Sequence, residues 1–228
     1  MKPDAEVNDA GDEPGPTEWA AAGQPAPVGV GPHPRPWPAG DQYDPELLAG
    51  GDARNVVDRY RYWRREAIVA DLDRGRHPLH VAIENFAYDA NIGTVVRTAN
   101  AFAVREVHIV GRRRWNRRGA MVTDRYQHLR HHADVGSLLD HAGDVGLTVV
   151  AVDNLPGSVP IETTALPRDC LLLFGGESAG LSDEARAGAA VTVSIAQFGS
   201  TRSINAGVAA GIAMHAWIRQ HADLSTAG

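Results

Sequence analysis

The segment LLLFGGESAGLSDEA, Leu171 to Ala185, indicates the fold class more clearly than any other part of the sequence. Its first four residues, Leu171–Phe174, are apolar and predict a buried strand. The strand runs into Gly175–Glu177, and Gly180 follows, so the backbone there can adopt unusual angles and approach a ligand closely. Ser182, followed by two acidic residues, is typical of a helix N-terminus. The segment therefore predicts a strand, a glycine turn and a helix; the alternative is a tight turn with no ligand.

On both sides of this segment, short apolar strands alternate with helices. We expect strands at Leu79–Ile83, Val107–Val110, Leu147–Val152, Leu171–Phe174 and Val191–Ile195, and helices at Ile92–Ala103 and Ser203–Gln220. This alternation predicts an α/β fold with a parallel sheet and helices on both faces. Ligand sites of such sheets lie at the carboxyl ends of the strands.

A second segment, NIGTVVRTANAF from Asn91 to Phe102, begins near the end of the first expected strand. On a helix, Asn91, Thr94 and Thr98 follow one another at three- and four-residue steps, and Arg97 lies six residues beyond Asn91. The pattern predicts a polar helix end directed at the site. The alternative is a helix-capping asparagine with an unrelated surface arginine.

A third segment, VSIAQFGSTRSINAGVAAGIAMHAW from Val193 to Trp217, joins the last expected strand to a long helix. A loop of small polar residues separates them, and Ser203 is expected to cap the helix. Gly207 and Gly211 leave the helix thin, which allows close backbone approach to its own domain or to a partner subunit. For the apolar positions, the alternative is an ordinary core helix.

Together, the order and spacing of the three segments resemble the signature motifs of SpoU (TrmH-like) RNA ribose 2'-O-methyltransferases of the SPOUT superfamily, over roughly residues 79–220. The chain departs from the usual pattern at Ile195–Gln197, where Ile-Pro-Met is common, and at Ile204, where Leu is common. The resemblance implies a SPOUT-type fold with a C-terminal deep trefoil knot, a homodimer and S-adenosylmethionine as cofactor. It also implies methylation of a ribose 2'-hydroxyl in transfer or ribosomal RNA.

The resemblance further implies roles for individual residues. The residues expected to position or activate the ribose are Asn91, Arg97, Glu177, Ser203 and Asn205. Those expected to contact the cofactor, largely through their backbone, are Val152, Gly175, Gly176, Ile195 and Ile204. Because a guanidinium stays protonated, we expect Arg97 to bind a phosphate and stabilise alkoxide charge rather than to act as the base.

The charge distribution supports an RNA partner despite a net charge of −6. Residues 54–130 hold sixteen arginines against eight acidic residues, a net charge of +8, whereas the segments before and after this block are acidic. Within this block, the segment 112–132 combines seven arginines with aromatic rings that can stack on bases. The residues expected to bind RNA are Arg112, Arg113, Arg114, Trp115, Arg117, Arg118, Arg125 and Tyr126. The alternative is a solvated charged face.

Four regions are expected along the chain. Residues 1–50 hold ten of the 14 prolines and predict a disordered tail. Residues 51–77 predict a basic N-terminal helix, centred on 55–74, which either packs on the core or contacts RNA. Residues 78–222 form the methyltransferase domain, and 223–228 a short tail.

Composition excludes several other classes. The lone Cys170 rules out an internal disulfide and fits a reducing cytoplasm, and no apolar run is long enough to span a membrane. No metal is expected, because His128, His131 and His132 lack carboxylate or cysteine partners at ligand spacing. A nucleotide-dependent oxidoreductase is disfavoured by the missing glycine fingerprint. A non-catalytic RNA-binding protein with the same fold remains the main alternative.

Overall fold

The computed structural model describes residues 29–84, 86–111 and 114–226, and the chain divides after Arg64 into two compact units. The second unit contains a seven-stranded sheet in the order β3-β2-β1-β6-β4-β7-β5, and every neighbouring pair of strands is parallel. The strands are β1 His77–Glu84, β2 Val104–Val110, β3 Leu129–His132, β4 Thr148–Val152, β5 Val159–Pro160, β6 Cys170–Phe174 and β7 Val191–Ser194. The predicted parallel sheet is confirmed.

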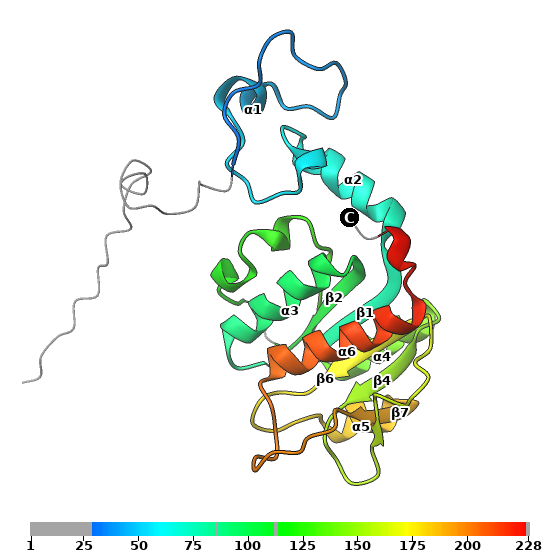
Figure 1. The fold of residues 1–228 in the computed structure, drawn as a ribbon. Coiled ribbons are helices and arrows are strands. Elements are labelled where there is room, and N and C mark those ends of the chain that lie inside the picture. Colours follow the sequence, from blue (N-terminus) through cyan, green and yellow to red (C-terminus); the bar gives the residue numbers. More distant parts are fainter. Residues whose placement is uncertain (1–28, 85, 112–113, 227–228) are drawn as a thin grey trace, which may run out of the picture. The chain divides into compact units, whose positions relative to one another are not determined.

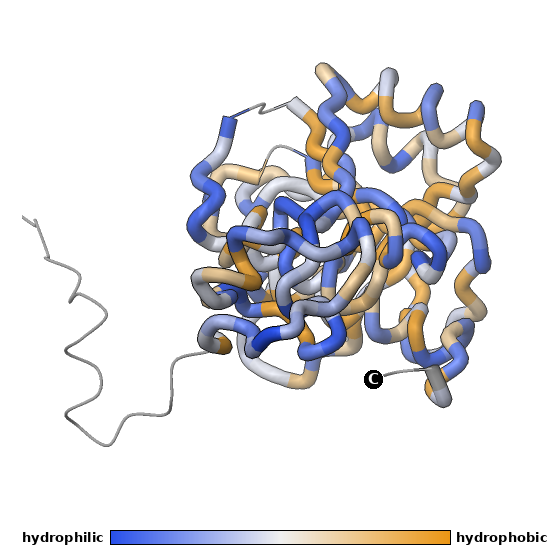
Figure 2. Tube along the Cα trace, turned by 90° about the horizontal axis from the view of Figure 1, so that it is seen from above, coloured by the Kyte–Doolittle hydropathy of each residue, from blue (hydrophilic) through white to orange (hydrophobic). Residues whose placement is uncertain are grey.

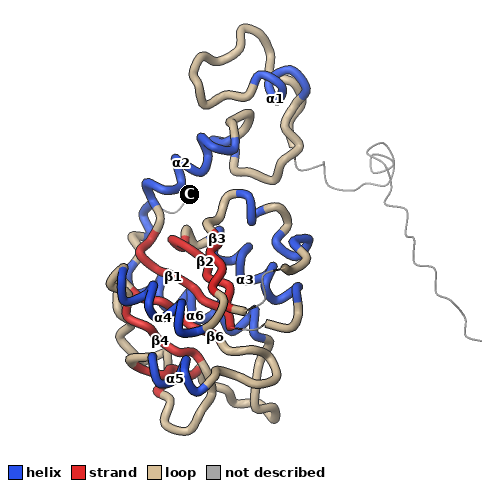
Figure 3. Tube along the Cα trace, turned by 180° about the vertical axis from the view of Figure 1, so that it is seen from behind, coloured by secondary structure: helices blue, strands red, loops and turns tan. Residues whose placement is uncertain are grey.

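Helices cover both faces of the sheet, as predicted (Figures 1 and 3). On one face lie α3 (Asp89–Ala101) and α6 (Ala206–His221), which pack against each other. On the other face lie α4 (Val135–Asp144) and the short α5 (Asp183–Gly188). The trefoil knot that the resemblance implies stays a prediction.

Alternation along the strands supplies two hydrophobic cores, because successive side chains of a strand point to opposite faces. Leu79, Val81 and Ile83 of β1 pack in the core beneath α3 and α6, which also buries Trp217. Ala82 of β1 belongs to the second core, beneath α4 and α5. Hydrophobic and hydrophilic residues are interspersed along the described part of the chain, as the colours of Figure 2 show. Cys170 is buried, as the sequence suggested.

Three elements of the sheet unit were missed in the sequence, namely β3, α4 and the two-residue strand β5. The strand β3 carries an arginine and two histidines rather than an apolar run, so its residues were interpreted only as part of a charged segment. The helix α4 has a capping box in which Asp134 and Ser137 satisfy each other's backbone N–H groups. This signal was present in the sequence and was overlooked.

The structure differs from the expectations about the N-terminal region at α1 and η2, in the first unit, and at α2, in the second unit. Within the predicted disordered tail, residues 45–50 form the helix α1 (Pro45–Gly50), capped by Asp44; residues 1–28 lie outside the described part of the chain. Within the predicted helix 55–74, only a 3-10 turn, η2 (Asp58–Tyr60), forms before α2 (Arg65–Gly75) begins. A last 3-10 turn, η5 (Leu224–Thr226), falls within the predicted C-terminal tail.

One buried carboxylate, Asp52, contributes to the order of the first unit. The side chain of Asp52 is fully buried, pairs with Arg54 at 2.7 Å, and accepts a hydrogen bond from the Tyr62 backbone N–H at 2.9 Å. Burial would raise the pKa of Asp52, but these hydrogen bonds outweigh it and lower the pKa to about 2. A buried, fully partnered carboxylate orders a segment that would otherwise gain little from apolar burial.

Candidate cofactor cleft and active site

A cleft of about 340 Å³ opens at the carboxyl ends of β4, β6 and β7. This is the edge at which ligands bind to open parallel sheets. All five residues expected to contact the cofactor line it, namely Val152, Gly175, Gly176, Ile195 and Ile204. Glu177 and Ser203 line it as well. The volume falls within the range of small-molecule sites, and glycine-rich backbone makes up much of the wall, as a nucleoside-containing ligand held by backbone groups requires.

The turn after β6 depends on glycine at position 175. A Cβ atom added there would lie 2.1 Å from the carbonyl carbon of Gly180 and from the nitrogen of Leu181, so no larger residue fits. Gly180 has a positive φ of 68° and its N–H donates to the Gly176 carbonyl oxygen at 2.8 Å. Asp153, after β4, accepts a hydrogen bond from the Leu181 N–H at 3.2 Å. The turn is thereby folded back on itself and tied to the neighbouring strand.

A chain of three side chains connects the three sequence motifs. The Asn91 amide donates from Nδ2 to Glu177 Oε1 at 2.8 Å, and the Asn205 amide donates from Nδ2 to Asn91 Oδ1 at 3.0 Å. The other end of the Asn205 amide accepts the Val208 N–H at 3.1 Å and so caps α6. The structure therefore brings together three of the five residues expected to position or activate the ribose.

Glu177 also caps the N-terminus of α3. Its carboxylate accepts hydrogen bonds from the backbone N–H groups of Ala87 at 2.7 Å and Tyr88 at 3.4 Å, ahead of the first helical turn. Burial would raise the pKa of Glu177, but the hydrogen bonds from Asn91, Ala87 and Tyr88 outweigh it and lower the pKa below its usual value. The carboxylate is therefore charged at neutral pH and complements the positive end of the helix dipole.

The structure excludes the alternative of a capping Asn91 and corrects the expectation of a capping Ser203. Asn91 is not the N-cap of α3, because the helix begins at Asp89 and the side chain of Asn91 is buried against Glu177. Ser203 does not cap α6, because Asn205 takes that position. Ser203 is instead an exposed residue of the loop that lines the cleft. Its hydroxyl is available to a ligand rather than committed to the helix.

Arg97 lies on the exposed surface of α3. Within the described part of the chain, its guanidinium has no hydrogen-bond or ion-pair partner, in contrast to Arg54 or Arg76. The neighbouring position, Thr98, donates its hydroxyl hydrogen to the Thr94 carbonyl oxygen, and both threonines face α6. Arg97 therefore extends from a helix that is fixed on one side by α6 and at its start by Glu177, with its charge free to meet an anion.

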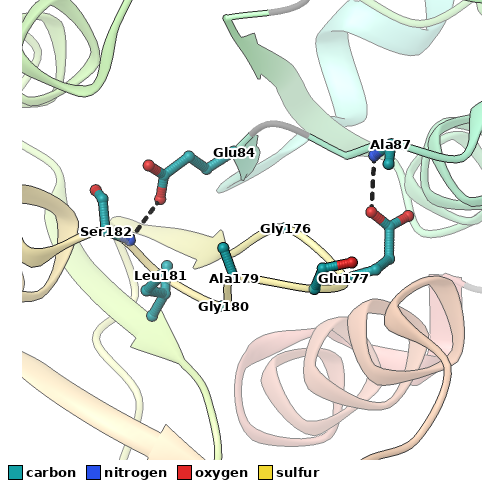
Figure 4. Close-up of a pocket in the computed structure, with 9 residues that line it drawn as sticks. Glu84, Ala87, Gly176, Glu177, Ala179, Gly180, Leu181 and Ser182 are labelled. Atoms are coloured by element: carbon teal, nitrogen blue, oxygen red, sulfur yellow. Dashed lines mark hydrogen bonds between the residues drawn. The ribbon is translucent and has the colours of Figure 1, made fainter.

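A second cavity, of about 260 Å³, adjoins the cleft on the other side of the Gly176–Gly180 turn (Figure 4). Glu84, at the end of β1, is almost fully buried and accepts the Ser182 N–H at 3.1 Å. Glu177 points from the turn toward Ala87 on the opposite wall. The two carboxylates therefore tie the turn to the end of β1 and to the start of α3.

The arginine-rich segment after β2 packs along α3. The Asn116 N–H donates to Asp89 Oδ2 at 2.7 Å, and a Cβ on Gly93 would lie 2.4 Å from the carbonyl carbon of Gly119, so the two backbones are in close contact. Short 3-10 turns follow, η3 (Arg117–Ala120) and η4 (Thr123–Arg125). The segment is thus held beside the helix that carries Arg97.

The residues expected to bind RNA are placed unequally within this segment. Arg114, Arg117, Arg118 and Arg125 are exposed, and Arg117 is engaged with Asp124 at 3.2 Å. Trp115 and Tyr126 are half-buried, and Trp115 packs against the core, which leaves less ring surface for stacking than the sequence suggested. Arg112 and Arg113 lie outside the described residues.

Sequence reasoning missed several residues of the cleft. These are Asp153, Asn154, Gln197 and Arg202. The position of Asp153 and Asn154 directly after an expected strand was a usable signal, because loops at the carboxyl ends of strands form the site. No comparable pattern marks Arg202, whose carbonyl oxygen accepts from the Asn154 amide at 3.2 Å only because the loop folds back.

Comparisons with known proteins agree with this geometry. The SpoU rRNA Methylase family profile matches residues 78–215, and the chain belongs to that family. A tRNA (guanosine(18)-2'-O)-methyltransferase of Escherichia coli is 27% identical over 160 residues, covering 68% of this chain and 70% of the relative. The enzyme of the same name from Thermus thermophilus is 28% identical, covering 69% and 82%.

Solved structures give the same fold. An AdoMet-bound rRNA methyltransferase from Sinorhizobium meliloti superposes with a TM-score of 0.58 at 28% identity, over 64% of this chain. The chain spans 59% of the length of that protein. Within the described residues, no helix is both long and apolar enough to cross a membrane.

Proposed function

We propose that this chain is an S-adenosylmethionine-dependent methyltransferase that methylates a ribose 2'-hydroxyl in structured RNA. The single observation that carries the proposal is the hydrogen-bonded chain Asn205–Asn91–Glu177. It couples a cleft built on strand ends and glycine backbone to the helix that bears the unpartnered Arg97. The names of the family and of its relatives support the same reaction.

S-adenosylmethionine, when bound in the cleft, would supply an electrophilic methyl group. The residues present fit such a ligand: a glycine turn that admits close backbone approach, apolar walls from Val152 and Ile195, and the polar groups of Asp153 and Asn154. These are the contacts that a flat base, a ribose and a charged amino-acid tail require.

The protein's task in this reaction is to hold the ribose and to stabilise charge on its oxygen. The guanidinium of Arg97 cannot act as a base because it stays protonated. We assign it to the phosphate next to the target ribose and to the negative charge that develops on the 2'-oxygen. The proton leaves to water or to a phosphate oxygen. Asn91 and Glu177 fix the helix, and the free Ser203 hydroxyl is placed to bind the ribose or the cofactor.

Two further expectations belong to this proposal. The first is a homodimer formed through α6, which leaves Val208 and Ile212 exposed at 52% and 39% on a helix otherwise rich in small residues. The second is the trefoil knot of the sheet unit. Three more statements remain predictions. Region 51–77 contacts RNA, region 78–222 is the catalytic part, and the protein is cytoplasmic.

The test is transfer of a tritiated methyl group from S-adenosylmethionine to RNA by the purified full chain. Total tRNA and ribosomal subunits serve as separate substrates, and nuclease digestion then maps the resistant 2'-O-methylated dinucleotide. Transfer to a ribose of either RNA supports the proposal and names the substrate. Tight RNA binding without transfer to any RNA would instead favour a non-catalytic RNA-binding protein.

A further inference from the structure

A cluster of four histidines and one glutamate lies on the sheet unit away from the cleft. His80 comes from β1, Glu106 and His108 from β2, His132 from β3 and His141 from α4. On β1 and β2 these residues alternate with those of the core beneath α3 and α6, so they face α4. The cleft, by contrast, lies at the carboxyl ends of β4, β6 and β7.

Three of these residues, His80, Glu106 and His108, have ligand atoms that all lie within 4.8 Å of one another. His80 Nδ1 lies 2.9 Å from His108 Nε2, and Glu106 Oε2 lies 3.8 Å from the same His108 nitrogen and 3.9 Å from His141 Nε2. Ligand atoms about 2.0–2.2 Å from a tetrahedral zinc ion are separated by roughly 3.3–3.6 Å. The separations among His80, Glu106 and His108 fall on both sides of that value, and His141 reaches the same group through Glu106, so its ring must move closer to become the fourth ligand.

One member of the cluster, His141, has a buried ring nitrogen without a hydrogen-bond partner among the described residues. This atom, Nε2 of His141, faces Glu106. A buried ring nitrogen without a partner costs free energy. Coordination of a cation between His141 and Glu106 would satisfy both.

The remaining histidine, His132, is not a ligand in this arrangement but is hydrogen-bonded to one. His132 Nε2 lies 2.9 Å from His108 Nδ1, so it fixes which nitrogen of His108 faces the cluster. Metal-binding histidines commonly hydrogen-bond through their other ring nitrogen in this way.

We propose that His80 Nδ1, His108 Nε2, His141 Nε2 and Glu106 bind one divalent transition-metal ion of the zinc type. Four protein ligands leave no open position, so the ion is structural. It links β1 and β2 to α4 rather than taking part in methyl transfer. This replaces the expectation of no metal, which rested on His128, His131 and His132 and overlooked residues that are close only in the fold.

The competing arrangement is a cluster without metal, in which Arg130 alone neutralises Glu106. Arg130 Nε lies 3.1 Å from both carboxylate oxygens of Glu106. In the metal-bound state, Arg130 keeps one oxygen and the ion takes the other. Arg130→Gln should therefore leave metal binding intact or strengthen it, whereas in the competing arrangement no variant of this cluster changes metal binding.

The test uses the full chain without a histidine tag, stripped with a chelator and dialysed. Zn²⁺ is titrated calorimetrically, and Co²⁺ serves as a spectroscopic probe of tetrahedral coordination. We expect one ion per chain, visible cobalt absorption typical of tetrahedral sites, and a higher melting temperature with zinc. Loss of a direct ligand in Glu106→Gln or His141→Gln should weaken binding by at least about tenfold, since even outer-shell changes cost about 10–100-fold.

The matched control is His131→Ala, which removes an exposed histidine of β3 outside the cluster. It should bind zinc like the unaltered chain. Glu106→Gln and His141→Gln are partly exposed positions and are checked for folding by circular dichroism before titration. A chain with no stoichiometric zinc binding, or variants that bind zinc as tightly as the unaltered chain, would overturn the proposal.

Discussion

Glu177 Oε1 accepts a hydrogen bond from Asn91 Nδ2 at 2.8 Å, and the two residues are 86 positions apart in the sequence. The same carboxylate accepts hydrogen bonds from the backbone N–H groups of Ala87 and Tyr88, which precede α3, so both of its oxygens have a hydrogen-bond donor. The turn after β6 and the start of α3 are therefore one unit. Anything that moves the turn also moves the helix that carries Arg97.

Glu177→Gln tests this coupling. An amide has only one oxygen, so its NH₂ group must face either the Ala87 N–H or the Asn91 amide, both of which donate. One of these donors is then left without its acceptor, and where this donor is the amide of the buried Asn91 the cost is about 1–3 kcal/mol. We expect a lower free energy of unfolding and slower methyl transfer, measured by urea denaturation and tritium transfer. Glu184→Gln, on exposed α5, is the control. Unchanged stability and rate in Glu177→Gln would contradict the coupling.

This pair also shows what the sequence could and could not reveal. Strand runs and glycine turns predicted the parallel sheet and the edge at which the cleft lies, because both are set by local periodicity. The family resemblance named Asn91 and Glu177 together, but no local pattern could show that they touch. Asp153 directly follows an expected strand and could have been predicted, whereas Arg202 reaches the cleft only because its loop folds back in three dimensions. The ordered first unit was missed because its composition does not reveal the partners of the buried Asp52.

Arg97→Lys keeps the positive charge but loses the planar fork that binds two phosphate oxygens at once. If Arg97 stabilises charge on the reacting oxygen, transfer should fall by about 100-fold or more, as for loss of one oxyanion donor. Binding of S-adenosylmethionine, measured by calorimetry, should not change. Arg186→Lys on α5 serves as the control. Transfer at nearly the original rate in Arg97→Lys would refute the bidentate role.

Gly175→Ala tests the turn that lines the cleft. The added Cβ would meet backbone atoms of Gly180 and Leu181 at 2.1 Å, so the turn must shift. Overpacking of this kind costs about 1–3 kcal/mol, and we expect binding of S-adenosylmethionine to be lost as the wall moves. Gly143→Ala, in α4 with open space around it, should be neutral or slightly stabilising. If calorimetry shows that Gly175→Ala still binds S-adenosylmethionine with the original affinity, the turn does not form the cofactor site.

The exposed arginines Arg114, Arg118 and Arg125 should contribute to RNA binding through charge. Replacing each by Ala is expected to weaken binding similarly for different RNA sequences, because phosphate contacts carry no sequence information. Each lost contact should reduce the slope of log affinity against log salt by roughly 0.7–0.9. Filter binding at several salt concentrations measures the slope. Arg186→Ala on α5 is the control, and equal slopes in all variants would favour the solvated-face alternative.

The buried histidines predict how stability depends on pH. Burial lowers the pKa of His80 to about 4 and of His108 to about 2, against 6.5 for a free histidine, and nearby Arg105, Arg130 and His141 add to the shift of His80 while Glu106 opposes it. Between pH 6.5 and 4 the unfolded chain therefore binds protons that the folded chain does not.

The free energy of unfolding should be highest above about pH 7 and should fall progressively as the pH drops from 6.5 to 4. Urea unfolding from pH 7.5 to 5, with a chelator present to exclude metal, measures it. His80→Gln should flatten the profile between pH 6.5 and 5, because one titrating ring is removed, whereas His215→Ala on the exposed side of α6 should leave it unchanged. If His80→Gln and the unaltered chain lose stability in parallel, the pH dependence does not originate at His80, since no other change separates the two proteins.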